Sequence, residues 1–514
     1  MGKKTLAKPK LWYVRKTAKD VILMSITQAK KNITIARCMN RTPYPLKLHQ
    51  SEGVQFMVQK EIEPGIKGGL LCDEPGMGKT IQIAALMKIN QVSKTLLIVP
   101  VCVIKQWLRV MIDVFDKKNI YIHYGNQRAR SLSELETLRT TNGKKNVENM
   151  IVISTYGVVN SSKSSKDHLL FDISWDRVVL DEGHIIRNKN TKTFKKANKL
   201  TRNYSWILTG TPLQNKLGDI KSLFKFINQT GKSITINRLI ENNMIRRTKR
   251  DLPRESSLEN LQIMNTKCIF RSKDEQDTYM ALHRNLMGEY GEASLKLGDE
   301  DTWMEMLEQI IRLRQASIDS ELAIKSFCTK FNIDSWSFSK KRSTKITCFL
   351  NKIKKVDGYS LVFCHFRQEM ELIKKELEKE GIESELYHGS MSLQERKEVV
   401  DKFPFGEEKK KALIIQIKAG GVGLNLQQFT NIFIISPDWN PCNEIQAIAR
   451  AHRIGQHKKV VVYKFTIVAN KKFMDVNEDI KTIDQLIIQK QKLKRDLMVK
   501  TLNDKSLEFN ETTV

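Results

Sequence analysis

Short apolar runs that lack polar alternation recur in two sets along the chain. The first set lies at residues 96–99, 151–153, 177–180 and 206–208, and the second at 361–363, 413–415, 432–435 and 460–463. Such runs are typical of strands that are buried on both faces of a parallel sheet. Helix-compatible stretches, such as 81–89 and 369–380, separate them. The repeated alternation predicts an α/β protein with two lobes, each a parallel sheet flanked by helices.

A segment of different character lies between the two sets. Residues 251–340 are rich in Glu, Met, Leu and Gln, and residues 303–316 have helical periodicity, with an apolar face made by Met306, Leu307, Ile310, Ile311 and Leu313. We therefore predict a helical insertion or bridge at 251–340. It would separate a first lobe at 41–250 from a second lobe at 341–490. Residues 1–40 are a predicted basic arm, and residues 491–514 a polar tail.

The charge of the chain indicates a polyanionic partner. Its 514 residues exceed the size at which one hydrophobic core keeps growing, and they carry a formal net charge of +30. Nucleic acid is the first candidate partner for such a surplus. A lysine-rich proteome encoded by an AT-rich genome would give the same composition, so charge alone leaves both explanations open.

The cysteine pattern and the hydropathy of the chain indicate in which cellular compartment the protein is found. The eight cysteines are scattered and none forms a C-x-x-C pair, which argues against zinc ribbons and RING fingers. The N-terminus lacks the apolar core of a signal peptide, and no apolar run approaches membrane-spanning length. We expect a soluble intracellular protein that is not secreted and has no membrane partner.

A glycine-rich turn follows the apolar residues 69–72 and precedes the helical stretch 81–89. Its sequence is Asp73-Glu-Pro-Gly-Met-Gly-Lys-Thr80. Strand, glycine turn and helix N-terminus together make a phosphate cradle, because free amides and the helix dipole point at the anion. Lys79 would reach the outer phosphates and the Thr80 hydroxyl would ligate magnesium. Asp73 stands where the consensus has Gly.

Two adjacent carboxylates, Asp181 and Glu182, end the apolar run 178–180. A carboxylate at the carboxyl end of a buried strand faces the ligand crevice of an α/β sheet. Asp181 would hold magnesium through water, and Glu182 would orient and deprotonate an attacking water. The alternative is an acidic turn that caps a strand.

Two arginines, Arg450 and Arg453, lie three residues apart near the end of the second lobe. We predict that they share one face of a short helix. Guanidiniums aimed in one direction suit a group whose negative charge grows during reaction, such as a phosphoryl in transfer. Because the glycine turn at 73–80 is far upstream, the two segments can serve one nucleotide only at a site between two lobes.

Together these segments resemble a known family. The motifs at 73–80, 181–184, 208–215, 419–426 and 446–456 follow the order of superfamily-two helicase motifs. The forms LTGTPLQN (208–215), PDWNP (437–441) and RAHRIGQ (450–456) are similar to those of SWI/SNF-type DNA-translocating ATPases. The resemblance covers about residues 45–465. It implies two RecA-like lobes, ATP and Mg²⁺ in the cleft, and duplex translocation. A strand-separating DNA or RNA helicase and an inactive scaffold are the alternatives.

The resemblance also assigns residue roles. It implies that Gln50 reads adenine, and that the nucleotide is bound by Asp73, Gly76, Met77, Gly78, Lys79, Thr80 and Gln446. It implies magnesium at Thr80 and Asp181, and catalysis by Lys79, Asp181, Glu182, Arg450 and Arg453. The segments expected to contact nucleic acid contribute Pro100, Trp107, Thr155, Thr211 and Gly421. Gln416-Ile417 departs from the family's Ser-Thr before the glycine turn.

The resemblance further implies double-stranded DNA as partner, with a protein complex or nucleoprotein as a further substrate. It places the protein in the nucleus or a viral replication compartment.

Overall fold

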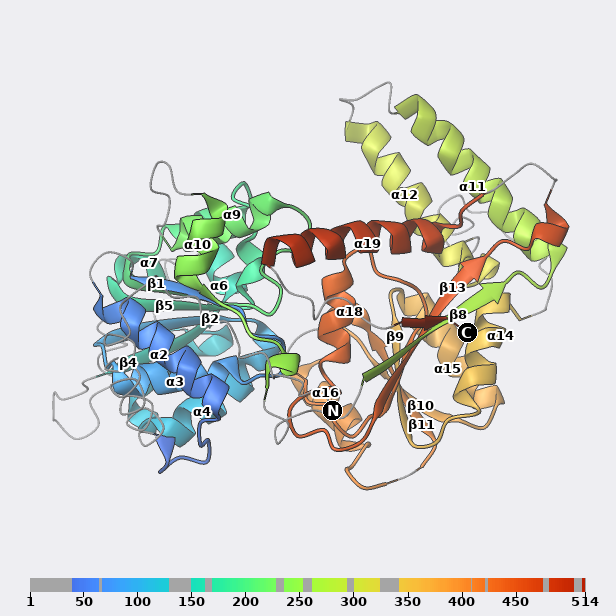
Figure 1. The fold of residues 1–514 in the computed structure, drawn as a ribbon. Coiled ribbons are helices and arrows are strands. Elements are labelled where there is room, and N and C mark those ends of the chain that lie inside the picture. The colour runs from blue at the N-terminus through green and yellow to red at the C-terminus, as the bar shows by residue number, and fades with distance from the viewer. Residues whose placement is uncertain are drawn as a thin grey trace, which may run out of the picture.

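The protein is described from a computed structural model. It covers residues 39–63, 67–128, 149–161, 169–227, 235–252, 261–293, 300–323, 342–407, 409–420, 424–474, 480–502 and 511–513. Two lobes lie side by side, each built on a seven-stranded sheet (Figure 1). The predicted α/β class with two parallel sheets is confirmed. The basic arm, apart from residues 39 and 40, and Gly421 lie outside the described residues.

The first lobe has the strand order β3-β4-β2-β5-β6-β1-β7, and every pairing is parallel. Its strands are β1 (Gly68–Leu71), β2 (Lys94–Val99), β3 (Ile120–Ile122), β4 (Met150–Thr155), β5 (Trp175–Asp181), β6 (Arg202–Leu208) and β7 (Met244–Ile245). Its helices are α2 (Leu48–Ile62), α3 (Lys79–Ile89), α4 (Ile104–Val114), α6 (Tyr156–Asn160), α7 (Leu169–Asp172), α8 (Lys192–Asn198), α9 (Leu217–Phe226) and α10 (Ile236–Asn243). Apolar clusters cover both faces of this sheet, which is why its strands lack polar alternation.

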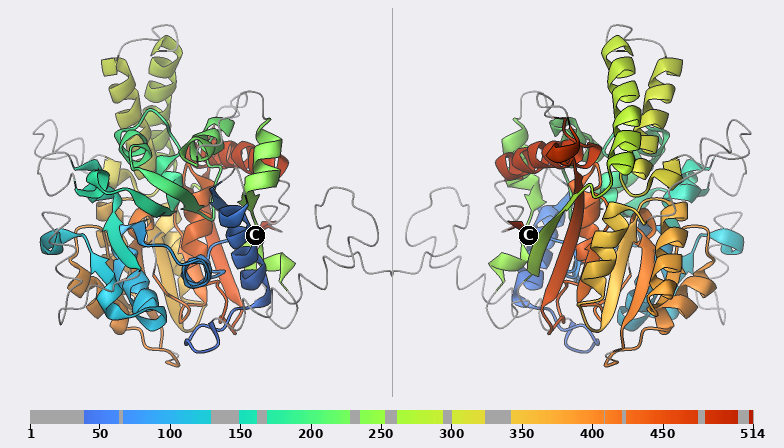
Figure 2. Two further views of the ribbon diagram at one scale, coloured as in Figure 1. Left: turned by 90° about the vertical axis from the view of Figure 1, so that its left-hand side faces the viewer. Right: turned by 90° about the vertical axis from the view of Figure 1, so that its right-hand side faces the viewer.

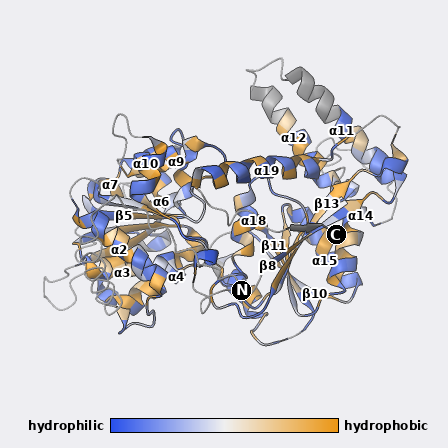
Figure 3. Cartoon of the chain, viewed as in Figure 1, coloured by the Kyte–Doolittle hydropathy of each residue, from blue (hydrophilic) through white to orange (hydrophobic). Residues whose placement is uncertain are grey.

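The second lobe repeats this plan with the strand order β10-β11-β9-β12-β13-β8-β14. Its strands are β8 (Leu261–Ile269), β9 (Tyr359–Cys364), β10 (Glu383–Tyr387), β11 (Lys411–Gln416), β12 (Asn431–Ile434), β13 (Val460–Val468) and β14 (Glu511–Thr513). Its helices are α11 (Lys273–Ala293), α12 (Glu300–Ala316), α14 (Thr344–Ile353), α15 (Arg367–Lys379), α16 (Leu393–Asp401), α17 (Ile417–Gly420), α18 (Pro441–Ile448) and α19 (Ile483–Leu502). Hydrophobic residues concentrate in the strands, whereas most helices carry both hydrophobic and hydrophilic residues (Figure 3).

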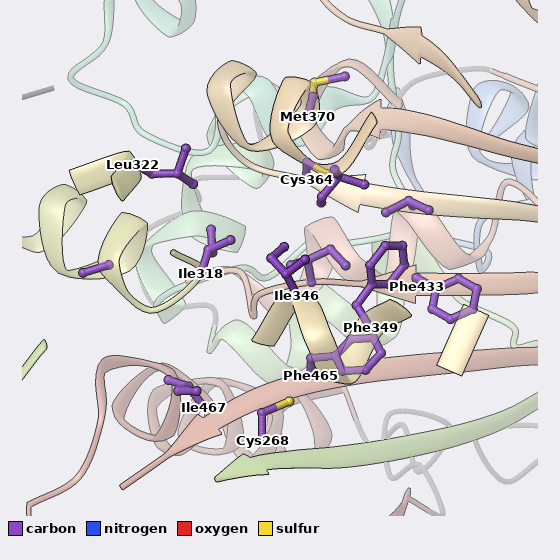
Figure 4. Packing of buried hydrophobic residues seen from close by; sticks show 14 of the residues in the cluster. Cys268, Ile318, Leu322, Ile346, Phe349, Cys364, Met370, Phe433, Phe465 and Ile467 are labelled. Carbon is purple, nitrogen blue, oxygen red and sulfur yellow. The ribbon is translucent and has the colours of Figure 1, made fainter. Parts of the chain in front are cut away.

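Aromatic side chains fill the core between α14 and the second sheet. Phe349 of α14 meets Phe433 and Phe465 edge-to-face, with ring centroids 5.5 and 6.2 Å apart (Figure 4). All three rings are at most 1% exposed. This geometry adds to the free energy gained from area burial, and it anchors α14 across two neighbouring strands.

The prediction of a purely helical insertion at 251–340 is wrong at its start. β8 lies within that range and pairs in parallel with β13 over its whole length. Its sequence mixes apolar and polar residues because only Ile263 and Cys268 are fully buried, so it lacks the apolar run of the other strands. The helical part begins at α11, and α11 and α12 form a hairpin that projects from the second lobe (Figure 2).

The predicted boundary at 491 is also wrong, because it falls inside α19. Ile483 and Ile487 of this helix are in the core of the second lobe. Farther along, Met498 is 2% exposed and clusters with Leu213 of the first lobe and Cys442 of α18. α19 therefore runs across both lobes (Figure 1). Of the described helices, none is long and apolar enough to cross a membrane.

A buried ion pair ties α2 to the first sheet. Arg177 of β5 donates from Nε and Nη2 to the two carboxylate oxygens of Glu61, at 2.7 and 2.5 Å. The same carboxylate accepts from Trp206 Nε1 at 2.8 Å and from Asn90 Nδ2 at 2.6 Å. Both charged residues are at most 1% exposed. Four donors thus compensate the cost of removing the Glu61 charge from water.

Candidate functional site

The candidate site lies at the carboxyl edge of the first sheet, where it faces the second lobe. β5, β6 and β1 are neighbours in the sheet order, and all run in the same direction. The segments that follow them, at 72–80, 181–187 and 209–215, therefore emerge together. This is how three motifs spread over more than a hundred residues come to share one crevice.

The glycine turn has the geometry of a phosphate cradle. Gly76 and Gly78 have φ values of +91° and +82°, which L side chains rarely adopt. Gly78 is the N-cap of α3 and provides no side-chain cap, so the amides at the start of the helix stay available to an anion. Gln50 packs directly on this turn, and its Nε2 donates to the Met77 carbonyl at 3.2 Å.

Lys79 begins α3 and points back over the turn. Its Nζ donates to the Asp73 carbonyl at 2.8 Å and lies 3.5 Å from the Glu74 carbonyl. Burial lowers the pKa of Lys79, while the carboxylates of Glu182, Asp73 and Asp181 oppose that shift. A phosphate beside this ammonium would stabilise its charge, so the cradle and its lysine fit a nucleotide's phosphates.

Asp73 is a structural residue as well as the first residue of the cradle. Its side chain is fully buried and pairs with Arg247, whose Nε and Nη2 donate at 2.9 and 2.6 Å. Gln82 Nε2 donates to the same carboxylate at 2.9 Å. The departure from the consensus Gly is thus explained by an ion pair that joins the cradle to the segment after β7. The sequence alone assigned no role to Arg247.

Asp181 and Glu182 end β5 in a strained turn. Glu182 has φ +48°, and among the described residues it is the one non-glycine with a positive φ. Such strain is characteristic of functional sites, where the surrounding structure holds it in place. Trp107 Nε1 donates to Asp181 Oδ2 at 2.7 Å, and the Glu182 amide to Asp181 Oδ1 at 3.0 Å.

The two carboxylates differ in their electrostatic environment. Burial, together with the neighbouring Glu182 charge, raises the pKa of Asp181 to about 6. Burial also acts to raise the pKa of Glu182, but His184, Lys79 and Arg450 outweigh it and lower the pKa to about 2. Since a divalent cation favours the ionised form of a nearby carboxylate, the unfavourable ionisation of Asp181 fits a magnesium site there. Thr80, partly buried one residue into α3, supplies a hydroxyl of the kind such a site uses.

The arginine segment comes from the second lobe and closes the crevice. Arg450 Nη2 lies 4.0 Å from Glu182 Oε1, and Arg450 is 8% exposed. Arg453 lies against the cradle, because a Cβ built on Gly76 would be 2.8 Å from the Arg453 Cβ. Burial lowers the pKa of both guanidiniums, and for Arg450 the charges of Glu182 and Asp181 oppose the shift.

The predicted helix carrying both arginines is wrong. α18 ends at Ile448, and Arg450 and Arg453 follow in turns. The Arg450 carbonyl accepts from the Leu426 amide at 3.1 Å, so it is bonded to the loop before β12 instead of to a further helical turn. The two guanidiniums still reach one crevice, since the turns present both toward the first lobe.

Hydrogen bonds join the lobes around this crevice. Gln446 Nε2 donates to Thr211 Oγ1 at 3.3 Å, and Asn440 Nδ2 to Gln214 Oε1 at 3.0 Å. The lobes are therefore in contact, with the arginine segment against the cradle.

Three of the side chains predicted to contact nucleic acid are turned inward. Trp107 and Thr155 are each 1% exposed; the former bonds to Asp181, and the latter caps α6 by accepting from the Val158 amide. Thr211 is 5% exposed and bonds to Gln446. In this arrangement these three side chains are buried, and their contact with nucleic acid stays a prediction. Trp107 lies on the apolar face of α4, a position that its helical spacing could have indicated. Pro100 is partly buried at the start of a short helical turn.

Two family models match successive parts of the chain. A model of the SNF2-related domain matches residues 49–231, and a model of the helicase conserved C-terminal domain matches residues 341–455. Together they cover more than half of the chain. The solved SWI2/SNF2 ATPase core of Sulfolobus solfataricus in complex with dsDNA aligns with 90% of this chain and 97% of its own, at 22% identity and a TM-score of 0.38.

Curated relatives are similar over most of this chain. The CHD3-type chromatin-remodeling factor CHR7 of Arabidopsis thaliana is 24% identical over 88% of the chain, but this alignment covers 38% of the plant protein. The probable global transactivator of Orgyia pseudotsugata multicapsid polyhedrosis virus is 24% identical over 82% of the chain and 86% of its own length. The chain thus spans well under half of the plant relative and most of the viral one. With both domain models matched in order, this chain belongs to the SNF2-related family of helicase-like ATPases.

Proposed function

We propose that this chain is an ATP-driven translocase on double-stranded DNA, which hydrolyses ATP between its two lobes. The observation that carries the proposal is the composite crevice. Lys79, Asp181 and Glu182 come from the first lobe, and Arg450 approaches Glu182 from the second at 4.0 Å. A site completed only when two lobes meet couples hydrolysis to their relative movement.

The proposed roles follow from position and charge. The cradle and Lys79 bind the phosphates, and Gln50 lies close enough to the cradle to contact a base. Glu182 is ionised at neutral pH because its pKa is lowered, so it can orient the attacking water. Arg450 and Arg453 stabilise the charge that develops on the transferred phosphoryl group.

Magnesium is proposed at Thr80 and Asp181. Bound there, the ion would neutralise phosphate charge and favour the ionised form of Asp181. Trp107 fixes the orientation of that carboxylate through its indole N–H. This is a positioning role, which the sequence did not predict.

Duplex DNA is the proposed partner. The net charge of +30 supports a polyanion, and grip through phosphates would be salt-dependent and weakly sequence-specific. The names of the relatives, a chromatin-remodeling factor and a probable global transactivator of a virus, support action on nucleoprotein in a nucleus or viral replication compartment.

Phosphate release measured in parallel without nucleic acid and with single-stranded DNA, duplex DNA and RNA tests this proposal. We expect duplex DNA to stimulate turnover most. Displacement of a triplex-forming strand without unwinding of a fork would support translocation. Unwinding of the fork would instead assign a strand-separating helicase, and the absence of ATP hydrolysis under all conditions would reject the motor.

The close approach of the lobes at Gly76 gives a steric prediction. In Gly76→Ala, the new methyl would overlap the Arg453 Cβ at 2.8 Å and would force φ +91° on an L residue. We expect kcat for ATP to fall about tenfold or more, because the arginine segment is displaced from the cradle. Steady-state ATPase assays with saturating DNA measure this.

Gly358→Ala is the matched control. Gly358 has a comparable φ of +75°, but a methyl group added there would meet nothing within 4 Å. It therefore carries the backbone strain, on the order of 1–2 kcal/mol, without the steric overlap. Equal losses of kcat in both variants would show that strain, and not lobe approach, explains the Gly76 effect.

A further inference from the structure

Lys249 lies where the phosphate cradle and the arginine segment meet. It opens the short turn Lys249–Asp251 that follows β7, and its side chain is 9% exposed. Its Nζ donates to the His452 carbonyl of the second lobe at 2.7 Å. The same ammonium lies 3.2 Å from Glu74 Oε1 in the cradle. One cation thus contacts both halves of the crevice.

The first-lobe side of this bridge is held rigidly. The Lys249 amide donates to Glu74 Oε2 at 2.8 Å, and the Glu74 amide donates to the Arg247 carbonyl at 2.9 Å. Asp251 accepts from both the amide and the hydroxyl of Thr248, at 2.7 and 2.8 Å, which fixes the turn. The backbone from which the Lys249 side chain extends is therefore fixed, and this directs the ammonium toward the His452 carbonyl of the second lobe.

In the second lobe, Lys249 contacts the backbone carbonyl of His452. His452 lies between Arg450 and Arg453, the two arginines of the crevice. A bond to its carbonyl fixes the backbone of this segment, regardless of the side chain that residue 452 carries. The carbonyl of Arg450, two residues earlier, accepts from the Leu426 amide at 3.1 Å. The segment is thus held from its own lobe at Arg450 and from the first lobe at His452.

The position of the Lys249 ammonium disfavours its charged form. Burial lowers the pKa of Lys249, as do the charges of Arg453 and Lys79, and Glu74 opposes them. The contact to His452 gives a reason for a lysine here, because it needs a donor that reaches across the lobes.

We propose that Lys249 is a positioning residue, which sets the arginine segment 450–453 against the phosphate cradle by bridging Glu74 and the His452 carbonyl. The proposal rests on the ATPase function proposed above. Lys249 acts through Arg450 and Arg453. Its loss reduces the fraction of molecules with closed lobes in which these two arginines are correctly placed. Binding of ATP by the cradle itself is left nearly intact.

Steady-state ATPase measurements on Lys249→Met, Lys249→Arg and Arg250→Met test this. Met keeps the length of the side chain but removes the donor and the charge. We expect kcat to fall about tenfold or more, with KM for ATP changed by less than about threefold. Lys249→Arg keeps a cationic donor and should recover most of kcat. Arg250→Met removes one exposed cation from the same turn and should match the wild type.

A background without either arginine separates positioning from a purely structural role. If Lys249 acts through the arginines, Lys249→Met should lower kcat by less than about twofold further in a variant that already carries both Arg450→Ala and Arg453→Ala. Additive losses of kcat would overturn the proposal, and so would a wild-type kcat in Lys249→Met. A loss of kcat that follows a fall in Tm and is not recovered in Lys249→Arg would also overturn it. A wild-type protein without ATPase activity would instead reject the proposed function, which keeps the two failures distinct.

Discussion

Arg450→Ala should lower kcat for ATP by about a thousandfold, at the lower end of what an arginine contributes to phosphoryl transfer. The guanidinium approaches Glu182 from the opposite lobe at 4.0 Å and is almost fully buried, so its removal takes a positive charge out of the crevice. ATP binding should persist, since the cradle and Lys79 belong to the first lobe. Single-turnover phosphate release and equilibrium binding of a labelled nucleotide measure the two effects separately.

Arg367→Ala provides the control for this loss. Arg367 is also an arginine of the second lobe, but it is 58% exposed on α15 and faces Glu371. Its removal should leave kcat unchanged. If Arg450→Ala retained the wild-type kcat, the arginine segment would have no part in hydrolysis and the composite site would be wrong.

Glu61→Ala should destabilise the first lobe by about 3–5 kcal/mol, as expected when one partner of a buried ion pair is removed. Arg177 is fully buried and would keep its charge without the carboxylate that accepts two of its hydrogen bonds. Trp206 Nε1 and Asn90 Nδ2 would lose the same acceptor. The shift of the urea midpoint, followed by tryptophan fluorescence, reports the change, since Trp206 contacts Glu61 directly.

The exposed Glu63, just beyond the end of α2, is the matched control. It accepts one hydrogen bond, from Gln59, at the surface. Glu63→Ala should change the stability by no more than about 0.5 kcal/mol. A similar midpoint for both variants would mean that the Glu61 network adds nothing to the stability of the lobe.

The strand pattern could be predicted where strands are buried on both faces. All eight apolar runs lie in or overlap strands of the two sheets, because an inner parallel strand needs apolar residues at successive positions. β8 was missed, since it is buried at few positions and looks like part of the polar segment around it. The arginine turn was missed for another reason. A helix-compatible sequence continues past Ile448, but the helix ends there, and the Arg450 carbonyl accepts a tertiary hydrogen bond from the Leu426 amide.

The geometry of the glycine turn was predictable, because its motif fixes local backbone conformation. Glycines with positive φ at 76 and 78 and an uncapped helix at Lys79 are properties of a short segment, and they occur as that segment predicts. The direction of a side chain, in contrast, cannot be predicted from a local motif, as Trp107 shows. Its segment suggested a surface that tracks DNA, and its indole instead holds Asp181.

By itself, the sequence determined two α/β lobes, a phosphate cradle and a pair of carboxylates at a strand end, since each depends on contiguous residues. Only the tertiary structure decided what meets across the crevice. Lys249 reaches His452, Arg247 holds Asp73, and Met498 of α19 packs against Leu213 of the first lobe. The physical reason is that these contacts join residues from about 170 to nearly 300 positions apart, and local propensity carries no information about them.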